Sequence, residues 1–344
     1  MSNTIAVVGA TGLIGRQILS TLWQHDVEPD DVRLFASEKS EGAEADYAEE
    51  TLPLEKPGPD SYRGVKAAIL AAPEGVAKAQ ALEAQKAGAW AIDLSGAFRL
   101  DTKVPLVAPG VNDGVLDRPF PGRVVSLASP AAQALTLALE PVRAAFGLAV
   151  VDATVLYGAA AKGGAGTERL SIQTAALLNA KEPDVEVFPH RLAFNVIPGV
   201  GDFENGLSAA ERHLMVEVAR IWGGENPLSP WGEGQGEGLP ALTTTALYVP
   251  TFHGTTLIVT AHLKNAVELD TLRATLKASS ELKVLDEPSA HIYPMPMLTT
   301  DDASVHVGRL RAQGTRIQLV IAVDNAFRAA ESAVDLALEL GDRS

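Results

Sequence analysis

The residues best suited to chemistry in this sequence form a glycine-rich turn near the amino terminus. Gly9-Ala10-Thr11-Gly12-Leu13-Ile14-Gly15 follows the apolar run Thr4–Val8 and precedes a helical pattern. A strand, a G-x-x-G-x-x-G turn and a helix are typical of dinucleotide binding, because the glycines let the backbone approach a pyrophosphate and the helix N-terminus favours its charge. The residues predicted to bind a cofactor are Gly9, Thr11, Gly12, Leu13, Ile14 and Gly15. The alternative is a tight turn with no ligand.

A second polar segment, Ser37-Glu38-Lys39-Ser40, follows the apolar run Val32–Ala36. An acid at this position binds the ribose hydroxyls of NAD, whereas hydroxyls and a lysine suit the 2′-phosphate of NADP. Ser37, Lys39 and Ser40 therefore predict NADP, and Glu38 keeps NAD open as an alternative. A solvated turn is the third interpretation.

The other side chains suited to catalysis are few. The sequence has no cysteine, which excludes a disulfide, a thiolate metal site and a cysteine nucleophile. Its histidines show no metal-ligand spacing, so no metal site is predicted. They are His25, His190, His213, His253, His262, His291 and His306.

The first part of the chain must position the glycine turn, and it alternates apolar runs with helical patterns. Strands are predicted over 4–8, 32–36, 66–72, 89–94 and 123–127, and helices over 14–22, 75–87 and 131–139. Strands and helices that alternate across short connections indicate a doubly wound parallel sheet.

The second part has a different pattern. Strands are predicted over 150–157, 244–249, 255–263 and 316–323, which suggests a mixed sheet, and helices over 167–180, 207–222 and 325–340. Ser208 is the expected N-cap of the second of these helices. Its apolar residues Leu214 and Val218 are expected in the core or at a subunit interface. An Ala/Gly-rich segment spans 158–166, and a surface loop is predicted over 227–240.

Length and charge narrow the class of protein. At about 100–200 residues per domain, 344 residues suggest two domains. The formal charge of -15 argues against nucleic-acid and anionic-membrane partners. Met1–Val8 lacks the features of a signal peptide, and no apolar stretch has transmembrane length. A soluble, cytoplasmic protein is expected.

Several further segments carry a resemblance to a known family. They are Asp93–Arg99, Val104–Val107, Val111–Asn112, Ala193–Pro198, Val307–Arg309 and Asp324–Asn325. Together with the glycine turn and Ser37–Gly42, they resemble aspartate-semialdehyde dehydrogenases over nearly the whole chain. The absence of cysteine makes the sequence similar to the cysteine-less, usg-type paralogues of that family.

The resemblance implies a specific chemistry, the reductive dephosphorylation of an acyl phosphate by NADPH in amino-acid biosynthesis. A cysteine thiolate forms a thioacyl enzyme, a histidine acts as acid and base, and an arginine holds the substrate carboxylate. A thiolate is a strong nucleophile, and imidazole moves protons near neutral pH.

This sequence departs from the family at these positions. The family's Asn-Cys pair falls on Ser129-Pro130, and its substrate-positioning glutamine falls on Tyr157. The substrate arginine and the catalytic histidine fall on Tyr248 and Thr255, and the glutamate and lysine of the substrate helix fall on Ala210 and His213. Such joint replacement implies that the catalytic site is lost.

Two matching residues are retained. Arg99 matches a phosphate-binding arginine, with a salt-bridged surface arginine as the alternative. Asn325 matches a cofactor-side asparagine near the nicotinamide, with an ordinary helix N-cap as the alternative.

Ser129, His253 and His213 are the candidate substitutes for the missing catalytic groups. A serine hydroxyl needs an adjacent base to act as a nucleophile. His253 precedes Thr255 by two residues, so on a strand both face the same side, about 7 Å apart. The alternative is that these histidines line a disused cleft.

The sequence thus predicts an α/β protein with an N-terminal NAD(P)-binding Rossmann domain and a mixed α/β dimerisation domain of the semialdehyde dehydrogenase type. The first comprises 1–129 with 324–344, and the second comprises 130–323. The expected function is that of a pseudoenzyme, a non-catalytic, NADP-binding homodimer that takes an acyl phosphate or carbonyl ligand. The alternative is an active NADP-dependent oxidoreductase that reduces a semialdehyde or another carbonyl without covalent catalysis.

Overall fold

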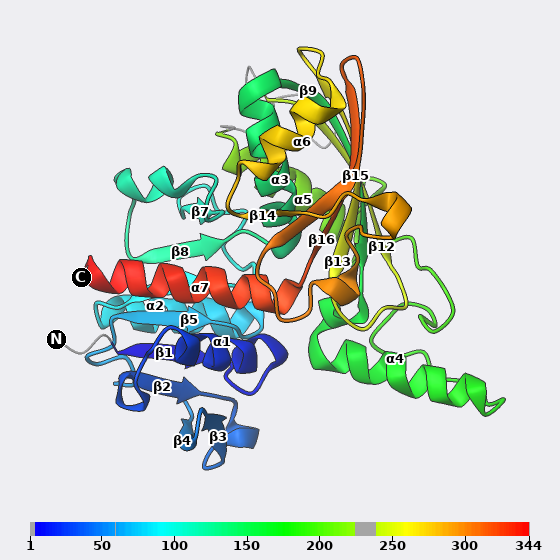
Figure 1. Ribbon diagram of the computed structural model, residues 1–344. Helices are drawn as coiled ribbons and strands as arrows, with labels where there is room; N and C mark the ends of the chain where they lie inside the picture. Colours follow the sequence, from blue (N-terminus) through cyan, green and yellow to red (C-terminus); the bar gives the residue numbers. More distant parts are fainter. Residues whose placement is uncertain (1–3, 59, 224–238, 344) are drawn as a thin grey trace. The chain divides into compact units, whose positions relative to one another are not determined.

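The computed structural model describes residues 4–58, 60–223 and 239–343 (Figure 1). It divides into two compact units, one of Met1–Pro109, Asp113–Ser129 and Ala326–Ser344, the other of Gly110–Asn112 and Pro130–Asn325. Relative to the expected domains, 110–112 and 324–325 lie in the second unit instead of the first. The reason at 110 is packing, since Gly110 lies against the Leu137 and Glu281 side chains of that unit.

The first unit is built on an eight-stranded sheet in the order β3-β4-β2-β1-β5-β6-β8-β7. All its pairings are parallel except the β3–β4 hairpin. Its strands are β1 Ile5–Val8, β2 Val32–Phe35, β3 Glu44–Tyr47, β4 Glu50–Glu55, β5 Ala67–Leu70, β6 Trp90–Asp93, β7 Leu106–Val107 and β8 Val124–Leu127. The predicted doubly wound parallel sheet is confirmed.

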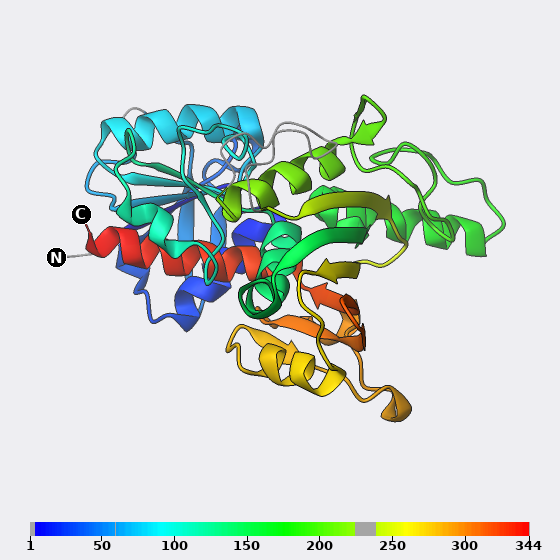
Figure 2. The same ribbon diagram turned by 90° about the horizontal axis from the view of Figure 1, so that it is seen from above.

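Helices cover both faces of this sheet (Figure 2). They are α1 Leu13–Gln24, α2 Glu74–Lys86 and α7 Asn325–Asp342. Alternate residues of β1 point to opposite faces, so Ile5 and Val7 pack with α1 and α7, and Ala6 and Val8 pack with the alanine stripe of α2. The carboxyl ends of the strands, which hold the glycine turn, are thereby fixed from both sides.

The second unit contains a mixed six-stranded sheet in the order β12-β9-β13-β16-β15-β14. Its strands are β9 Leu148–Tyr157, β12 Ala241–Tyr248, β13 Thr255–Leu263, β14 Leu282–Val284, β15 Val305–Gln313 and β16 Arg316–Val323, and a small hairpin pairs β10 Phe203–Glu204 with β11 Leu207–Ser208. The helices are α3 Pro130–Phe146, α4 Gly163–Leu178, α5 Ala209–Ile221 and α6 Leu269–Lys277.

Helices α3, α5 and α6 pack on one face of this sheet (Figure 1). The side chains of β13 reflect that arrangement. Leu257, Val259 and Ala261 are fully buried, and Ile258 between them is 49% exposed. The second face of the sheet carries threonine and aliphatic side chains and, at β13, is more exposed than the face that the helices cover.

Several elements differ from the sequence-based predictions. The β3–β4 hairpin was not predicted, because its charged residues resemble a loop, although charge is typical of edge strands. Strand β15 was missed because Gly308 interrupts it, and a Cβ there would collide with the Leu285 carbonyl oxygen. Helix α6 was missed although Leu272 and Leu276 recur at helical spacing on its buried side. The short strands β7 and β14 were also missed.

Helix boundaries shift where glycine and proline were interpreted as breakers. Helix α4 begins at Gly163 rather than at 167, and Gly166 lets it lie against the Ala159 carbonyl oxygen of the preceding 3₁₀ turn. Helix α3 continues to Phe146 through Pro141, beyond the predicted end at 139. The expected N-cap of α5 is confirmed at Ser208, whose backbone N–H donates to Glu211 Oε2 at 2.6 Å. The loop predicted over 227–240 lies outside the described residues as far as 238.

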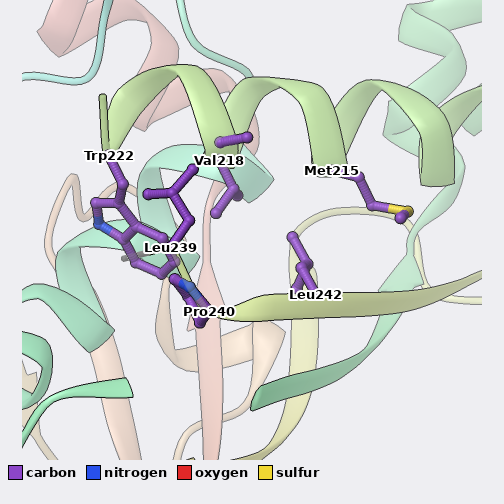
Figure 3. A pocket seen from close by; sticks show the side chains of 7 residues that line it. Met215, Val218, Trp222, Leu239, Pro240 and Leu242 are labelled. Atoms are coloured by element: carbon purple, nitrogen blue, oxygen red, sulfur yellow. The ribbon is translucent and has the colours of Figure 1, made fainter. Parts of the chain in front are cut away.

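The apolar side of α5 is core. Leu214 and Val218 are each 2% exposed, which confirms the core interpretation. Figure 3 shows Met215, Val218 and Trp222 of this segment facing Leu239, Pro240 and Leu242 around a cavity of about 10 Å³. That volume is at the limit for one water molecule, so the cavity is a packing gap and not a ligand site.

No helix among the described residues is long and apolar enough to cross a membrane.

A polar cluster ties the start of β15 to β14. Asp302 Oδ2 accepts from His306 Nε2 at 2.8 Å and from Lys283 Nζ at 3.1 Å, and its Oδ1 accepts from the Ser304 N–H at 2.8 Å. Burial by itself raises the pKa of the Asp302 carboxyl, but these hydrogen bonds outweigh it and hold the pKa well below the ordinary 3.8.

The lowered pKa predicts how stability depends on pH. A carboxyl with a depressed folded-state pKa stabilises the fold above its ordinary pKa and loses that contribution as the pH falls below about 4. We expect Asp302→Asn to lower the urea midpoint at pH 7 and to flatten its decline below pH 4. The neighbouring variant Asp301→Asn is the control and should match the unaltered protein. Equal midpoints for both variants at pH 7 would contradict this account.

Candidate functional site

The glycine turn connects β1 to α1 and requires glycine at two of its three positions. Gly9 has a φ of +87°, and a Cβ there would collide with the Ala71 carbonyl oxygen. A Cβ on Gly15 would collide with the Gly9 carbonyl oxygen and lie 2.8 Å from the carbonyl carbon of Ala10. Gly15 thus lets α1 pack directly on the end of β1, as expected for this motif.

Gly12 serves a different purpose, because it is the N-cap of α1 and is exposed. Having no side chain, it makes no side-chain capping hydrogen bond to the first helical turn, and that turn contains no acidic residue. Its backbone amides at Leu13, Ile14 and Gly15 therefore remain available to an anion, and the helix dipole adds to the attraction. Thr11 is also exposed at this end of the turn.

The predicted ribose segment also lies at the carboxyl end of the sheet. Gly9 and Ala10 donate backbone hydrogen bonds to the Phe35 carbonyl oxygen, at 2.8 and 3.3 Å, which places the glycine turn beside the end of β2. Ser37 follows as the N-cap of a 3₁₀ turn over Glu38–Ser40. The residues around it form a hollow of about 630 Å³ that includes Ser37 and Lys39 but not Ser40.

Arg99 is rigidly held at the ends of two neighbouring strands. Its Nε donates to the Leu127 carbonyl oxygen at 2.9 Å and its Nη2 to the Leu94 carbonyl oxygen at 2.7 Å. Gly96, with a φ of +93°, lies against the guanidinium group. A permanently charged group fixed at the carboxyl ends of parallel strands is well placed to bind an anion.

Asp93 builds the loop that carries this arginine. The side chain is fully buried, and its carboxylate accepts from the Ser95 N–H at 2.9 Å, the Phe98 N–H at 3.1 Å and Ser126 Oγ at 3.1 Å. The run Asp93–Arg99 is therefore a folded unit whose acid sets the backbone and whose arginine faces the strand ends.

In the second unit, three of the positions assigned by resemblance to catalysis lie in one row. Tyr157 at the end of β9 pairs in register with Tyr248 at the end of β12 and with Thr255 at the start of β13. Directly opposite residues on neighbouring strands have Cβ atoms about 5 Å apart. The structure thus brings together the positions that the sequence places almost 100 residues apart.

Two side chains of this row, Tyr248 and Thr255, are buried. Tyr248 is 2% exposed, packs edge-on against Phe188 at 5.1 Å, and belongs to an apolar cluster that Tyr157 and Ala210 also contact. Burial raises the pKa of the Tyr248 hydroxyl to about 12, so it stays neutral near pH 7. Thr255 is fully buried, and its Oγ1 has no hydrogen-bond partner. The row offers neither a positive charge nor a base.

The expected geometry of His253 is wrong. Strand β13 begins only at Thr255, and His253 lies in the preceding loop, where Gly254 has a φ of +79°. The alternation of side chains along a strand therefore does not apply to it, and it is exposed. Its backbone still lies close to the row, because a Cβ on Gly158 would be 3.0 Å from the His253 carbonyl oxygen.

The remaining candidates lie on helices. Pro130 is the first residue of α3, which follows β8, and proline is well accommodated there. Ser129 precedes it and is half-buried. His213 is half-buried on α5, one turn after Ala210. Glu211 of the same helix caps α5 and accepts from the Ala246 N–H of β12 at 2.9 Å, so it joins the helix to the sheet.

Among the described residues, one group of side chains has ligand atoms close enough to hold a metal, namely His25, Glu331 and Asp335. The sequence gave no indication of it, because α7 lies some 300 positions from α1. His25 Nε2 lies within hydrogen-bond distance of Glu331 Oε1, at 3.0 Å, so the group links the end of α1 to α7.

Comparison with known proteins decides the family. Residues 4–118 match the family model "Semialdehyde dehydrogenase, NAD binding domain", and residues 139–328 match "Semialdehyde dehydrogenase, dimerisation domain". The chain belongs to the semialdehyde dehydrogenase family. It is a cysteine-less member, as the resemblance indicated. Its first unit is accordingly an NAD(P)-binding domain, and its second unit contains the family's dimerisation domain.

Individual relatives of this family cover almost the full chain. Aspartate-semialdehyde dehydrogenase of Bacillus subtilis is 30% identical, with 98% of this chain and 96% of the relative aligned. A Pseudomonas aeruginosa protein named USG-1 protein homolog is also 30% identical, over 95% of this chain and 94% of its own. The solved structure of a probable aspartate-semialdehyde dehydrogenase from P. aeruginosa superposes with a TM-score of 0.85 at 30% identity, covering 99% of this chain and 98% of that one.

Asn325 lies at the N-terminus of α7. It is the first residue of α7 itself, not the residue before it. Its Oδ1 is buried and has no hydrogen-bond partner. A buried acceptor without a hydrogen-bond partner costs free energy.

Two residues that line the hollow after β2 were missed from sequence. Lys56, at the end of β4, and Gln80, on α2, line the same hollow as Ser37 and Lys39. The signal that could have found Lys56 is the apolar alternation of Leu52 and Leu54 just before it, which marks a strand ending at this edge.

Proposed function

We propose that this chain is an NADP-binding homodimer of the semialdehyde dehydrogenase family that does not perform the family's thioester chemistry. One observation supports the proposal: Tyr248, Tyr157 and Thr255 share one register row, which contains a buried threonine hydroxyl and borders an apolar cluster. The assignment of those positions rests on the family resemblance.

The missing chemistry concerns three separate requirements. Acyl transfer to the protein needs a nucleophile, and Pro130 has none. Proton transfer near neutral pH needs a group that titrates there, and a threonine hydroxyl does not. Holding a substrate carboxylate needs a cation, and an arginine at Tyr248 would be charged inside an apolar cluster.

Cofactor binding rests on the first unit alone. The turn at Gly9, Gly12 and Gly15 leaves the space that a pyrophosphate needs, and the uncapped amides of α1 supply donors. Ser37 and Lys39 would hold a 2′-phosphate. When bound, NADPH supplies a hydride at its nicotinamide ring.

The homodimer follows from the dimerisation domain and from the uncovered face of its sheet. Ile258 is exposed there between the half-buried Thr256 and Thr260, and Thr154 and Leu156 lie beside them on β9. Apart from the exposed Asp152 opposite Thr260, these are threonine and aliphatic side chains, which on a broad strand surface suit a second sheet. We infer that two copies pack through this face.

One observation favours the alternative of direct hydride transfer to a carbonyl. His253 is exposed, and its backbone lies against Gly158, next to Tyr157. It is the histidine nearest in sequence to the row, so it would be the proton donor of such a reaction. His253→Ala should then abolish any carbonyl reduction by NADPH.

The test is an assay of aspartate semialdehyde with phosphate and NADP⁺, with the Bacillus subtilis relative as positive control, and sedimentation equilibrium for the assembly. We expect dimers and no phosphate-dependent formation of NADPH. Turnover that requires phosphate would contradict the proposal, and a monomer would contradict its assembly.

A further inference from the structure

The hollow after β2 contains both an acid and two lysines, so its preference depends on how they pair. Its lining is Ala36, Ser37, Glu38, Lys39, Lys56, Pro57, Val76 and Gln80. Glu38 is the acid of this lining and occupies the place from which a carboxylate binds the ribose hydroxyls of NAD. Left unpaired, it would also repel a 2′-phosphate, which carries close to two negative charges at neutral pH.

Glu38 is engaged by Lys56. The Lys56 Nζ lies 3.4 Å from Glu38 Oε1, and the two side chains are 50% and 78% exposed. An ion pair this exposed contributes little to folding. Its effect is on the charge that the hollow presents to a ligand.

The backbone places Lys56 at this point. Strand β4 runs parallel to β2, with Leu34 opposite Leu54 and Phe35 opposite Glu55. The Ala36 N–H donates to the Glu55 carbonyl oxygen at 3.0 Å. The residue after β4 therefore lies beside the residues after β2, and Lys56 and Lys39 border one space.

We propose that Lys56 determines which dinucleotide this chain prefers: it neutralises Glu38 and adds a second cation beside Lys39, so that the hollow takes the 2′-phosphate of NADP. The inference rests on the proposed cofactor binding and names the residue that selects the cofactor. Without Lys56, the charged side chains of the hollow would be Lys39 and an unpaired Glu38. The free Glu38 carboxylate could then bind the hydroxyls of an unphosphorylated ribose.

The test is calorimetric titration with NADPH, NADH and the fragment 2′,5′-ADP, which reports on this hollow alone. Lys56→Gln should lower the affinity for NADPH and for 2′,5′-ADP by about tenfold or more, and the affinity for NADH should stay unchanged or rise. Glu38→Gln should weaken the binding of NADH and leave the affinity for NADPH unchanged. Any tighter binding of NADH by Lys56→Gln should disappear in the double variant, because the released carboxylate is gone.

Lys86→Gln is the matched control, since Lys86 is an exposed lysine of the same unit that pairs with Glu83 at 2.7 Å and does not line the hollow. It should bind all three ligands as the unaltered chain does. An unchanged ratio of NADPH to NADH affinity in Lys56→Gln would overturn this inference while leaving cofactor binding intact. Absence of binding by the unaltered chain to either nucleotide would overturn the proposed function and this inference with it.

Discussion

Gly15→Ala should unfold the glycine turn and eliminate nucleotide binding. The added Cβ would collide with the Gly9 carbonyl oxygen and crowd the Ala10 backbone, neither of which can move without displacing β1 from α1. We expect a loss of about 3 kcal/mol of stability, typical of severe overpacking. Urea unfolding followed by fluorescence, together with NADPH titration, measures both effects.

Gly12→Ala separates folding from binding at the same turn. Gly12 has a φ of -72°, and its nearest neighbour to a Cβ is the Gly9 carbonyl oxygen at 3.3 Å, so alanine fits. Stability should fall by only about 1 kcal/mol, because alanine is a poorer N-cap than glycine. NADPH affinity should nevertheless fall about tenfold or more, because the methyl group projects where the pyrophosphate approaches. Equal affinity for NADPH in both variants and the unaltered chain would contradict the cofactor assignment.

Pro130→Cys should not restore phosphate-dependent semialdehyde dehydrogenase activity. The new thiol would lie at the N-terminus of α3, where the helix favours a thiolate. A general acid or base contributes about 10²–10⁴-fold, and Thr255 cannot supply it. The substrate cation is absent as well, because Tyr248 fills that position within the apolar cluster.

The measurement is the rate of NADPH formation by Pro130→Cys with aspartate semialdehyde and phosphate, beside Pro130→Ser as the control for the loss of proline. Both rates should equal the background. Reaction with a thiol reagent confirms that the cysteine is folded and accessible. Clear turnover by the single cysteine variant, and not by the serine variant, would show that the catalytic site survives.

Local patterns were sufficient to predict the glycine turn and the strand and helix beside it. The β1–turn–α1 unit follows from a short apolar run, three glycines and a helical period, all within about 20 neighbouring residues. The β3–β4 hairpin was missed, and with it Lys56, because charged edge strands resemble loops and their pairing with β2 is not visible in the sequence.

The catalytic half depends on contacts between distant residues. No local pattern shows that Tyr248, Tyr157 and Thr255 share one register, because the pairing of three strands of a mixed sheet is set by packing. The prediction for His253 failed because β13 begins only at Thr255, and Gly254 with its positive φ separates His253 from the strand. To decide whether Asn325 is an N-cap, one must know the exact first residue of α7. Sequence patterns leave that boundary uncertain by one or two residues.

The central claim is that the nucleotide site works where the thioester site does not. Calorimetric titration of the purified protein with NADPH, and then with NADH, tests it most directly. We expect saturable binding of one nucleotide per chain with a preference for NADPH. No heat of binding with either nucleotide would contradict the account and leave a family fold that serves only as a dimer.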